Sequence, residues 1–209
     1  MFHYEELLGN LRAAYDRGAE FRENLTKQPW KLSERSAFLA LLQSEGARRL
    51  LEVGAGTGQD SSFFASQGLS VVATDLSPAM VSYCRAKGLD ARVVDVLALD
   101  FEPASFDAVY SVNCLLHVPN VDLPRALSTI ATVLRPGGLF YLGLWGGDGT
   151  EGILERDQHV PKRFFSFRTD AQIQSYVTSF FEVVDFHLVS TGDVEPYQSL
   201  TLRRPLDLT

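Results

Sequence analysis

The sequence predicts a doubly wound α/β fold, in which a mostly parallel sheet carries helices on both faces and ends in an antiparallel hairpin. The first observation behind this prediction is that short apolar strands alternate with helical segments between residues 50 and 145. Such alternation requires a parallel sheet covered on both sides. The second is a pair of alternating segments, residues 182–189 and 198–203, separated by a polar loop. At 209 residues the chain suits one domain, residues 1–209, with a sizeable core.

The first 46 residues predict a helical flap in front of the sheet. Apolar and aromatic side chains recur there at helical spacing, at Tyr4, Leu7, Leu8, Leu11 and Tyr15. Ser33 is placed to cap a second helix, which carries Phe38 and Leu42 and stops at Gly46. Residues 1–46 therefore precede the sheet and contribute no strand to it.

A strand, a glycine-rich loop and a helix follow one another at residues 50–68. Leu50, Leu51 and Val53 form an apolar run that predicts a buried strand, and glycines then stand at positions 54, 56 and 58. Glycine lets the backbone turn sharply and lets a ligand approach where a Cβ would clash. The start of the following helix presents unpaired N–H groups and a partial positive charge. This arrangement predicts a nucleotide-binding loop.

A polar residue follows each of the next three apolar strands. These residues are Asp75, Asp95 and Asn113, after strands near residues 70–74, 92–94 and 106–112. Parallel strands place their carboxyl ends at one edge of the sheet, and ligands of such sheets bind at that edge. The three side chains and the glycine loop therefore predict a single binding site.

Residues 146–168 predict a lid over the same edge. The segment is long for a connection and has no clear periodicity, and long loops are commonly functional. Basic and aromatic side chains are dense in it, although the whole chain is acidic. Aromatic rings line small-molecule pockets and arginines bind carboxylates or phosphates, so we predict that Arg163, Phe165 and Arg168 bind the substrate. The alternative is a lid that packs its rings inward and leaves its charges in solvent.

Four motifs together resemble those of the class I S-adenosylmethionine-dependent methyltransferases. Leu-Glu-Val-Gly-Ala-Gly-Thr-Gly at residues 51–58 is similar to the first motif, and Ala-Thr-Asp-Leu-Ser-Pro-Ala-Met at residues 73–80 to the second. Asp95 matches the third, and Leu-Arg-Pro-Gly-Gly at residues 134–138 matches the segment before the fifth strand. The resemblance implies a Rossmann-like fold with S-adenosyl-L-methionine as cofactor, S-adenosyl-L-homocysteine as product, and direct in-line methyl transfer to a small molecule.

The resemblance also implies which residues bind the methionine part of the cofactor. Those that would lie along it are Gly54, Ala55, Gly56 and Asn113, the last largely through its backbone. Tyr15, in the N-terminal flap, would bond the cofactor carboxylate. Glu52 would brace the glycine loop or bind the amino group.

The remaining implied contacts concern the nucleoside part. Asp75 would accept hydrogen bonds from both ribose hydroxyls, because the two oxygens of a carboxylate fit a vicinal diol. Leu76 and Met80 would pack on the adenine. Asp95 would accept from the adenine amino group beside the Val96 backbone.

Two histidines are the candidate catalytic bases. His117 follows the fourth strand, where members of this family often carry reacting groups, and His159 lies in the lid. A histidine titrates near neutral pH and takes a proton from a hydroxyl or an amine. His117 also has a second interpretation, in which its ring holds a turn through a hydrogen bond.

The composition favours a small-molecule substrate. A net charge of −7 and a pI near 5.1 argue against nucleic acid, and no apolar stretch is long enough to span a membrane. The N-terminus has no signal-peptide pattern, and Cys84 and Cys114 form neither a disulfide framework nor a metal-binding spacing, so we expect a cytoplasmic protein. The basic lid favours an anionic substrate.

Two other functions fit part of the pattern. A nicotinamide-dependent oxidoreductase also requires a glycine loop and an acidic residue after the second strand. Its glycine spacing is wider than the Gly-x-Gly-x-Gly found here, and Asp95 and the terminal hairpin also disfavour it. A non-catalytic S-adenosylmethionine-binding module would keep the cofactor pocket, but it would not need the open pocket beside the methyl group that an enzyme requires.

Overall fold

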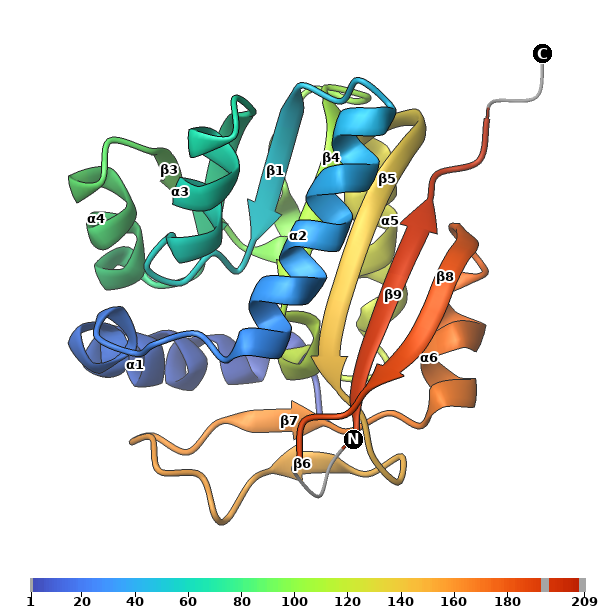
Figure 1. Ribbon diagram of the computed structural model, residues 1–209. Coiled ribbons are helices and arrows are strands. Elements are labelled where there is room, and N and C mark those ends of the chain that lie inside the picture. The colour runs from blue at the N-terminus through green and yellow to red at the C-terminus, as the bar shows by residue number, and fades with distance from the viewer. Residues whose placement is uncertain (1, 193–195, 207–209) are drawn as a thin grey trace.

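A seven-stranded sheet forms the centre of the computed structural model, which describes residues 2–192 and 196–206 (Figure 1). The strand order is β3-β2-β1-β4-β5-β9-β8. The parallel strands are β1 (Arg49–Val53), β2 (Ser70–Asp75), β3 (Asp90–Val93), β4 (Phe106–Val112) and β5 (Leu134–Trp145). β9 (Tyr197–Arg203) runs antiparallel between β5 and β8 (Glu182–Val189). The predicted doubly wound sheet and its closing hairpin are both confirmed.

Helices cover both faces of this sheet (Figure 1). α2 (Pro29–Ser44) and α3 (Gln59–Ser66) pack on one face, where Phe38 and Phe64 contact Tyr110 of β4. α5 (Leu123–Val133) and α6 (Asp170–Val177) cover the opposite face. α4 (Pro78–Ala86) packs beside β2 and β3. The strands and helices that alternate in the sequence thus form three layers, with the sheet between two layers of helices.

The expected N-terminal flap, residues 1–46, divides into two parts. α2 belongs to a helical layer of the sheet, whereas α1 (Tyr4–Glu23) lies across the carboxyl ends of the strands (Figure 1). The Asp16 carboxylate fixes α1 to the start of α4, because it accepts hydrogen bonds from the Ser77 hydroxyl (2.5 Å) and the Ala79 amide (3.2 Å). α1 is therefore the part of the flap that covers the edge where the site was predicted.

The predicted helix cap at Ser33 differs from the structure. α2 begins at Pro29 and not after Ser33, because the fixed φ of proline suits the first position of a helix. Asp122 precedes α5, and its carboxylate accepts a hydrogen bond from the Tyr4 backbone amide (2.8 Å). A capping box at Thr169 begins α6.

The segment before the fifth strand also differs. β5 begins at Leu134, and its pairing with β4 shifts between Phe106 and Ala108, so residues 135–138 form a bulge inside the strand. Gly138 is required there, because a Cβ would lie 2.8 Å from the Arg135 carbonyl oxygen. The sequence placed residues 134–138 before the fifth strand, but β5 includes them.

The insertion at residues 146–168 contains a two-stranded antiparallel hairpin that was not predicted. Its strands are β6 (Glu151–Ile153) and β7 (Phe164–Ser166), and they lie beyond the carboxyl edge of the main sheet (Figure 1). Three residues per strand are too few for an alternating pattern to stand out in the sequence.

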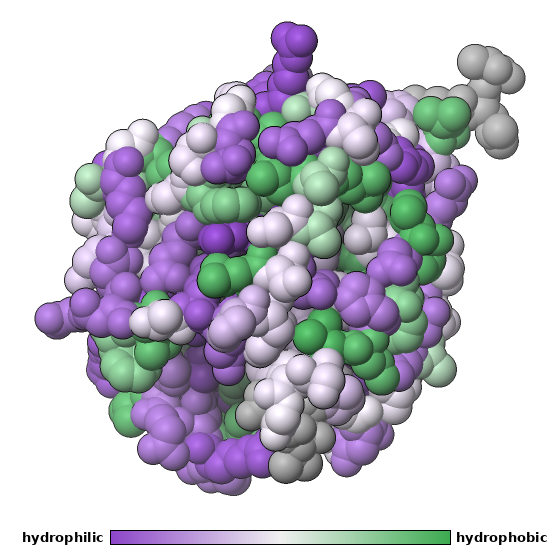
Figure 2. Space-filling view, viewed as in Figure 1, coloured by the Kyte–Doolittle hydropathy of each residue, from purple (hydrophilic) through white to green (hydrophobic). Residues whose placement is uncertain are grey.

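Hydrophilic and hydrophobic side chains are intermixed on the molecular face that carries α2 (Figure 2). Large apolar side chains that are exposed lie on several separate elements, such as Phe21 on α1 and Val184 on β8. Within residues 2–192 and 196–206, no helix has both the length and the apolar character needed to cross a bilayer.

Candidate functional site

Two adjoining cavities lie at the carboxyl edge of the sheet. The larger, here the glycine-loop cleft, has a volume of about 580 Å³ and is bounded by the glycine loop, the α1–α2 connection and the insertion. The smaller, here the Asp75 cavity, measures about 50 Å³ and lies between α1 and the ends of β2 and β4. Both are lined by Arg22, Gly54, Gly56 and Val112. A ligand that extends from one cavity into the other passes over the glycine loop.

The glycine loop is shaped by backbone conformations that need glycine. Gly54 has φ +75°, and a Cβ on it would lie 2.5 Å from the Cys114 Cβ. Gly56 also has a positive φ, +55°. The backbone amides of Gly54 and Ala55 both donate to the Thr74 carbonyl oxygen at 2.9 Å, which joins the loop to β2. The loop therefore presents the backbone of Gly54 and Gly56 to both cavities.

Asp75 lies where β2 ends and lines the smaller cavity. Its carboxylate accepts hydrogen bonds from the Gly56 amide (2.8 Å) and the Ser77 amide (2.9 Å). Burial raises the pKa of Asp75, while these two amides and the nearby Arg22 guanidinium oppose that rise. Each oxygen of a carboxylate has about two acceptor sites, so Asp75 retains capacity for a diol.

An apolar wall lies next to Asp75 in the same cavity. Leu76, Met80 and Val96 all line it. The Asp95 carboxylate accepts from the Leu97 amide (2.9 Å). Burial raises the pKa of the Tyr4 hydroxyl, and the nearby Cys114, Asp95 and Asp75 groups add to that rise. Tyr4 is thus a cavity residue beside Asp95, whereas the sequence placed it only on the apolar face of a helix.

Asn113 supplies an unsatisfied acceptor to the Asp75 cavity. Its backbone, at φ +53°, donates its N–H to the Gly143 carbonyl oxygen (2.8 Å), so that amide is not available to a ligand. Its Oδ1 is buried and has no hydrogen-bond partner among the described residues. An unpaired buried acceptor costs about 1–3 kcal/mol. A donor on a bound molecule would recover that energy, so Asn113 is equipped to act through its side chain.

Tyr15 and His117 form a buried pair that connects α1 to the loop after β4. The Tyr15 hydroxyl lies 2.6 Å from His117 Nε2, and His117 Nδ1 lies 2.7 Å from the Phe164 carbonyl oxygen. Burial lowers the pKa of His117 to about 3, so the ring is neutral. A neutral ring that donates from Nδ1 to the carbonyl must accept the Tyr15 proton at Nε2. His117 therefore has both nitrogens engaged, as its turn-holding interpretation requires.

The Arg163 side chain lies at the centre of contacts within the insertion. Two of its nitrogens bind both oxygens of the Asp157 carboxylate at 2.8 and 2.9 Å, and Nη1 donates to the Tyr15 hydroxyl at 3.0 Å. These bonds lower the pKa of Asp157, although burial opposes them. Arg163 thus joins the insertion to α1, and it lines neither cavity.

The other residues predicted in the insertion are divided between the cleft and the protein interior. Phe165 lines the cleft, where its ring stacks on Phe167 at 5.5 Å and 4°. Arg168 is fully buried and donates to Asn120 Oδ1 and to two backbone carbonyl oxygens, so it serves as an internal brace. His159 lies against Gly18 of α1, with Nδ1 3.2 Å from an Asp157 oxygen, and lines neither cavity.

Carboxyl groups form the floor of the glycine-loop cleft. Glu52 is 3% exposed and accepts a hydrogen bond from the Ser61 hydroxyl. Burial, and then the nearby Asp60 charge, raise the pKa of Glu52 to about 8. Asp60 is itself paired with Lys27 (2.6 Å) and Arg35 (2.9 Å). Glu52 therefore carries a proton at neutral pH, while two cations bind the Asp60 carboxylate.

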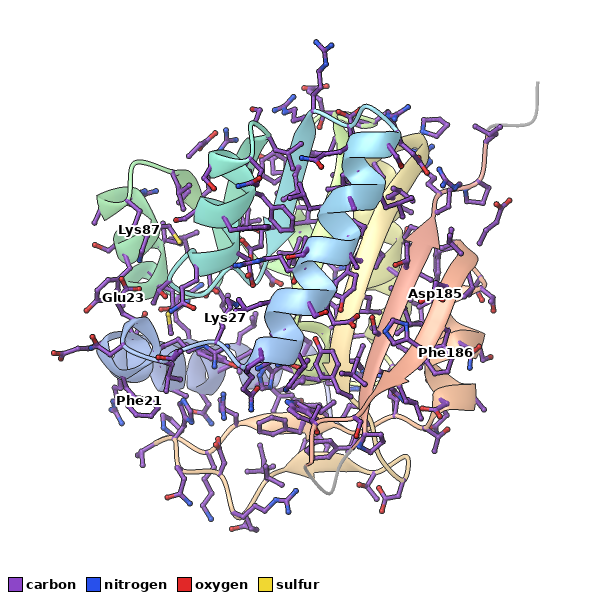
Figure 3. The ribbon with its side chains drawn as sticks, viewed as in Figure 1. Phe21, Glu23, Lys27, Lys87, Asp185 and Phe186 are labelled. Atoms are coloured by element: carbon purple, nitrogen blue, oxygen red, sulfur yellow. The ribbon has the colours of Figure 1, made fainter. Side chains whose placement is uncertain are left out.

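Ion pairs fix the α1–α2 connection over this cleft. Glu23, at the end of α1, pairs with Lys87 of α4 at 2.7 Å, and the two side chains point toward each other in Figure 3. Lys87 also donates to the Thr57 carbonyl oxygen of the glycine loop (2.8 Å). Lys27, which Figure 3 labels in the connection itself, pairs with Asp60 on the floor of the cleft at 2.6 Å.

Most of the positive charge in the cleft was not assigned from the sequence. The cationic side chains that line it are Arg22, Lys27, Lys31 and Arg156. Three of them come from residues 22–31. This stretch is polar and has no periodic pattern from which its secondary structure could be predicted. Three cations within ten residues are the signal that was available.

Comparisons with known proteins agree with this geometry. Residues 51–142 match the family described as methyltransferase domain. A ubiquinone biosynthesis O-methyltransferase from Xanthomonas campestris pv. campestris is 37% identical over 102 residues, which are 45% of this chain and 41% of that protein. The 24-methylenesterol C-methyltransferase 2 of Oryza sativa subsp. japonica is 35% identical over 114 residues, 50% of this chain and 31% of that protein. The matches thus span less than half the length of these relatives.

Among solved structures, a Burkholderia thailandensis 1,6-didemethyltoxoflavin-N1-methyltransferase shares the fold with a TM-score of 0.76. It is 24% identical, and the match covers 98% of this chain and 92% of that one. Its structure holds 1,6-didemethyltoxoflavin and S-adenosylhomocysteine.

Residues 51–142 thus match a methyltransferase domain, and the whole described chain shares its fold with solved methyltransferases.

Proposed function

We propose that the protein transfers a methyl group from S-adenosyl-L-methionine to a small molecule. The observation that carries this proposal is the continuity of the two cavities over the glycine loop, with Asp75 on one side and an open volume of about 580 Å³ on the other. Small-molecule sites commonly have volumes of about 300–1,000 Å³. A non-catalytic module would not need the second cavity.

The residues at the junction suit the cofactor. Asp75 would accept from the ribose diol, Leu76 and Met80 would pack on the adenine, and the unpaired Asn113 oxygen would take a donor hydrogen bond. The glycine loop would pass along the methionine part, with Glu52 bracing the loop through Ser61. When bound, the cofactor supplies a methyl group activated by a sulfonium leaving group.

Arg22 is a better partner for the cofactor carboxylate than Tyr15. The Tyr15 hydroxyl is already bonded to His117 and Arg163. Arg22 lines both cavities, and its Nε lies 4.0 Å from the place of a Cβ on Gly56. A guanidinium binds a carboxylate in a planar, bidentate way.

The acceptor would bind in the glycine-loop cleft. Phe165, Phe167 and Trp145 provide its aromatic lining, and its cationic side chains favour an anionic molecule. The relatives are named for transfer to oxygen, carbon and nitrogen, so the family does not define the acceptor atom. The chain would act by aligning acceptor and methyl group and by excluding water. A cytoplasmic location fits the free cysteines Cys84 and Cys114.

Calorimetric titration with S-adenosylmethionine, S-adenosylhomocysteine and NAD tests the proposal. We expect micromolar binding of the first two and none of NAD. Asp75→Ala should weaken binding at least about tenfold, because a hydrogen bond to a charged group contributes about 1.5–3 kcal/mol. Asp90→Ala is a matched control, since this aspartate lies at the exposed start of β3 and lines neither cavity. Binding of NAD alone would contradict the proposal.

Turnover separates an enzyme from a binding module. Formation of S-adenosylhomocysteine, measured over a panel of small hydroxyl, amine and carbon acids, should rise with at least one acceptor. The reaction without any acceptor gives the background rate. No rise above this rate with any acceptor would favour a binding module.

A further inference from the structure

β8 forms an open edge of the seven-stranded sheet (Figure 1). Its eight residues pair with β9 on one side only. Alternate residues of an antiparallel strand direct their N–H and C=O groups away from that partner. In the described part of the chain, no backbone group from outside the sheet hydrogen-bonds to β8. Such an edge is a template for pairing with a further strand.

The opposite edge of the sheet is better protected. β3 has only four residues, and the Arg85 side chain of α4 donates to the Ala91 carbonyl oxygen at 2.9 Å. A short edge strand whose carbonyl groups are occupied resists pairing with another chain. β8 is twice as long as β3, so it is the edge at which a second sheet can continue the first.

An apolar strip runs along β8. Val184 and Leu188 are 46% and 49% exposed, and Phe186 between them is partly buried against the core. Phe186 and Leu188 lie two residues apart and therefore share a face of the strand. A bulge opposes edge pairing, but the bulge of β8 lies at Val184, and residues 185–189 pair regularly with β9.

Opposite charges occupy the other face of the same strand. His187 Nδ1 lies 2.7 Å from an Asp185 oxygen, and Nε2 lies 3.2 Å from a Glu34 oxygen of α2. A ring that bonds to two carboxylates donates from both nitrogens and is a cation. Burial lowers the pKa of His187, but these hydrogen bonds outweigh it and the net shift is upward. Asp185 and Phe186 are neighbours on β8 in Figure 3, with the charge and the ring on opposite faces.

These side chains complement each other when two copies of β8 pair antiparallel about Phe186. Asp185 then lies opposite the second copy's His187, and Leu188 lies opposite the second copy's Val184. Opposite charges and apolar pairs facing each other across strands stabilise a sheet. Moving the centre by one residue in either direction would place Asp185 or His187 opposite itself, which is repulsive. The charges therefore select one register.

We propose that the protein forms a dimer in which β8 pairs antiparallel with β8 of a second copy, with Phe186 at the two-fold axis. Such an interface uses the same surface on both copies. A second copy is the partner because the charged and apolar side chains of the strand find their complements on the same strand. The proposal is independent of methyl transfer, since both cavities of the candidate site are lined by other elements.

Analytical ultracentrifugation of the full chain across the micromolar range tests the proposal. We expect a species of twice the 23.2 kDa mass of one chain. Leu188→Lys should yield monomer, because it brings two positive charges into the apolar strip. Val93→Lys is the matched control, since Val93 is 41% exposed on β3, at the other edge of the same sheet, and this variant should remain dimeric. Circular dichroism and thermal unfolding check that each variant is folded.

Cysteine cross-linking tests the register. Phe186→Cys should form a disulfide with its own copy, because opposing Cβ atoms lie about 4.5–5.5 Å apart, close to disulfide geometry. Leu188→Cys should not, since its counterpart would be displaced by four residues, about 13 Å along the strand. Combining Leu188→Cys with Val184→Cys should restore the cross-link. The unsubstituted chain, with Cys84 and Cys114, gives the background.

Three results would overturn the proposal. They are a monomer at every concentration, a dimer that survives Leu188→Lys or is lost equally in Val93→Lys, and cross-linking of Leu188→Cys as readily as Phe186→Cys. Calorimetry with S-adenosylhomocysteine reports separately on the proposed function.

Discussion

Replacing Gly54 by alanine tests whether the glycine loop is built for close backbone packing. Gly54 has φ +75°, which costs an L-residue about 1–2 kcal/mol. The added Cβ would also lie 2.5 Å from the Cys114 Cβ and 2.7 Å from its Sγ. Overpacking of this kind costs about 1–3 kcal/mol. We therefore expect Gly54→Ala to lower the free energy of unfolding by about 2–5 kcal/mol.

Gly88→Ala is the matched control for the backbone contribution alone. Gly88 has φ +78°, and a Cβ on it would meet nothing within 4 Å. This substitution should cost only the conformational part, about 1–2 kcal/mol. The difference between the two variants then measures the contact with Cys114.

Urea unfolding gives both free energies, and calorimetry with S-adenosylhomocysteine gives the affinity of each variant. Gly54→Ala should lose affinity because Cys114 or the loop must move, and both line or adjoin the Asp75 cavity. Gly88→Ala should bind as the unsubstituted protein does. Equal destabilisation of the two variants, with binding intact in both, would refute this account of the loop.

Three further substitutions test the buried polar groups. Tyr15→Phe leaves His117 Nε2 without its donor, so it should cost about 1–3 kcal/mol in urea unfolding and increase amide exchange in β6 and β7; unchanged exchange in that hairpin would argue against the link. Because burial raises the pKa of Glu52 from 4.5 to about 8, the folded chain binds the extra proton in this range and stability falls as pH rises through it. Glu52→Gln should flatten that fall, and a pH-independent difference between the two proteins would contradict it. For His117, whose pKa falls from 6.5 to about 3, the unfolded chain binds the extra proton, so stability falls as pH drops through this range. His117→Gln should reduce that acid sensitivity. Urea unfolding at both ends of the range measures it, and equal acid sensitivity of the two proteins would contradict the prediction.

The fold was predictable because its signals are local. Each signal depends on residues that lie close together in the sequence. Examples are the apolar strands, the glycine loop and the capping residues Ser77 and Thr169. The hairpin of β6 and β7 was missed because each strand has three residues, and the bulge in β5 was missed because glycine and proline usually end an element.

The cavity-lining side chains were easiest to predict where a strand end places them. Asp75 and Asn113 follow strands, and both line the predicted cavity. In the sequence, Arg163 and Arg168 cannot be distinguished from arginines that bind a substrate. Their tertiary contacts determine which role each has. Arg163 binds Asp157, six residues earlier, and Arg168 is buried among the carbonyl groups of the loop after β4. Basic residues in a lid therefore predict that cations are present without predicting which of them face the ligand.

α1 shows how an ordinary amphipathic pattern can conceal part of a binding site. Tyr4, Leu11, Tyr15 and Arg22 are spaced by seven, four and seven residues, which places them on one helix face, and all four line the Asp75 cavity. A stripe that only packed against the core would not end in arginine or carry two tyrosines. The cavity beneath it measures about 50 Å³, well below the about 300 Å³ of the smallest common ligand sites. If a nucleoside binds there, as proposed, the side chains of this α1 face are the ones that it must displace.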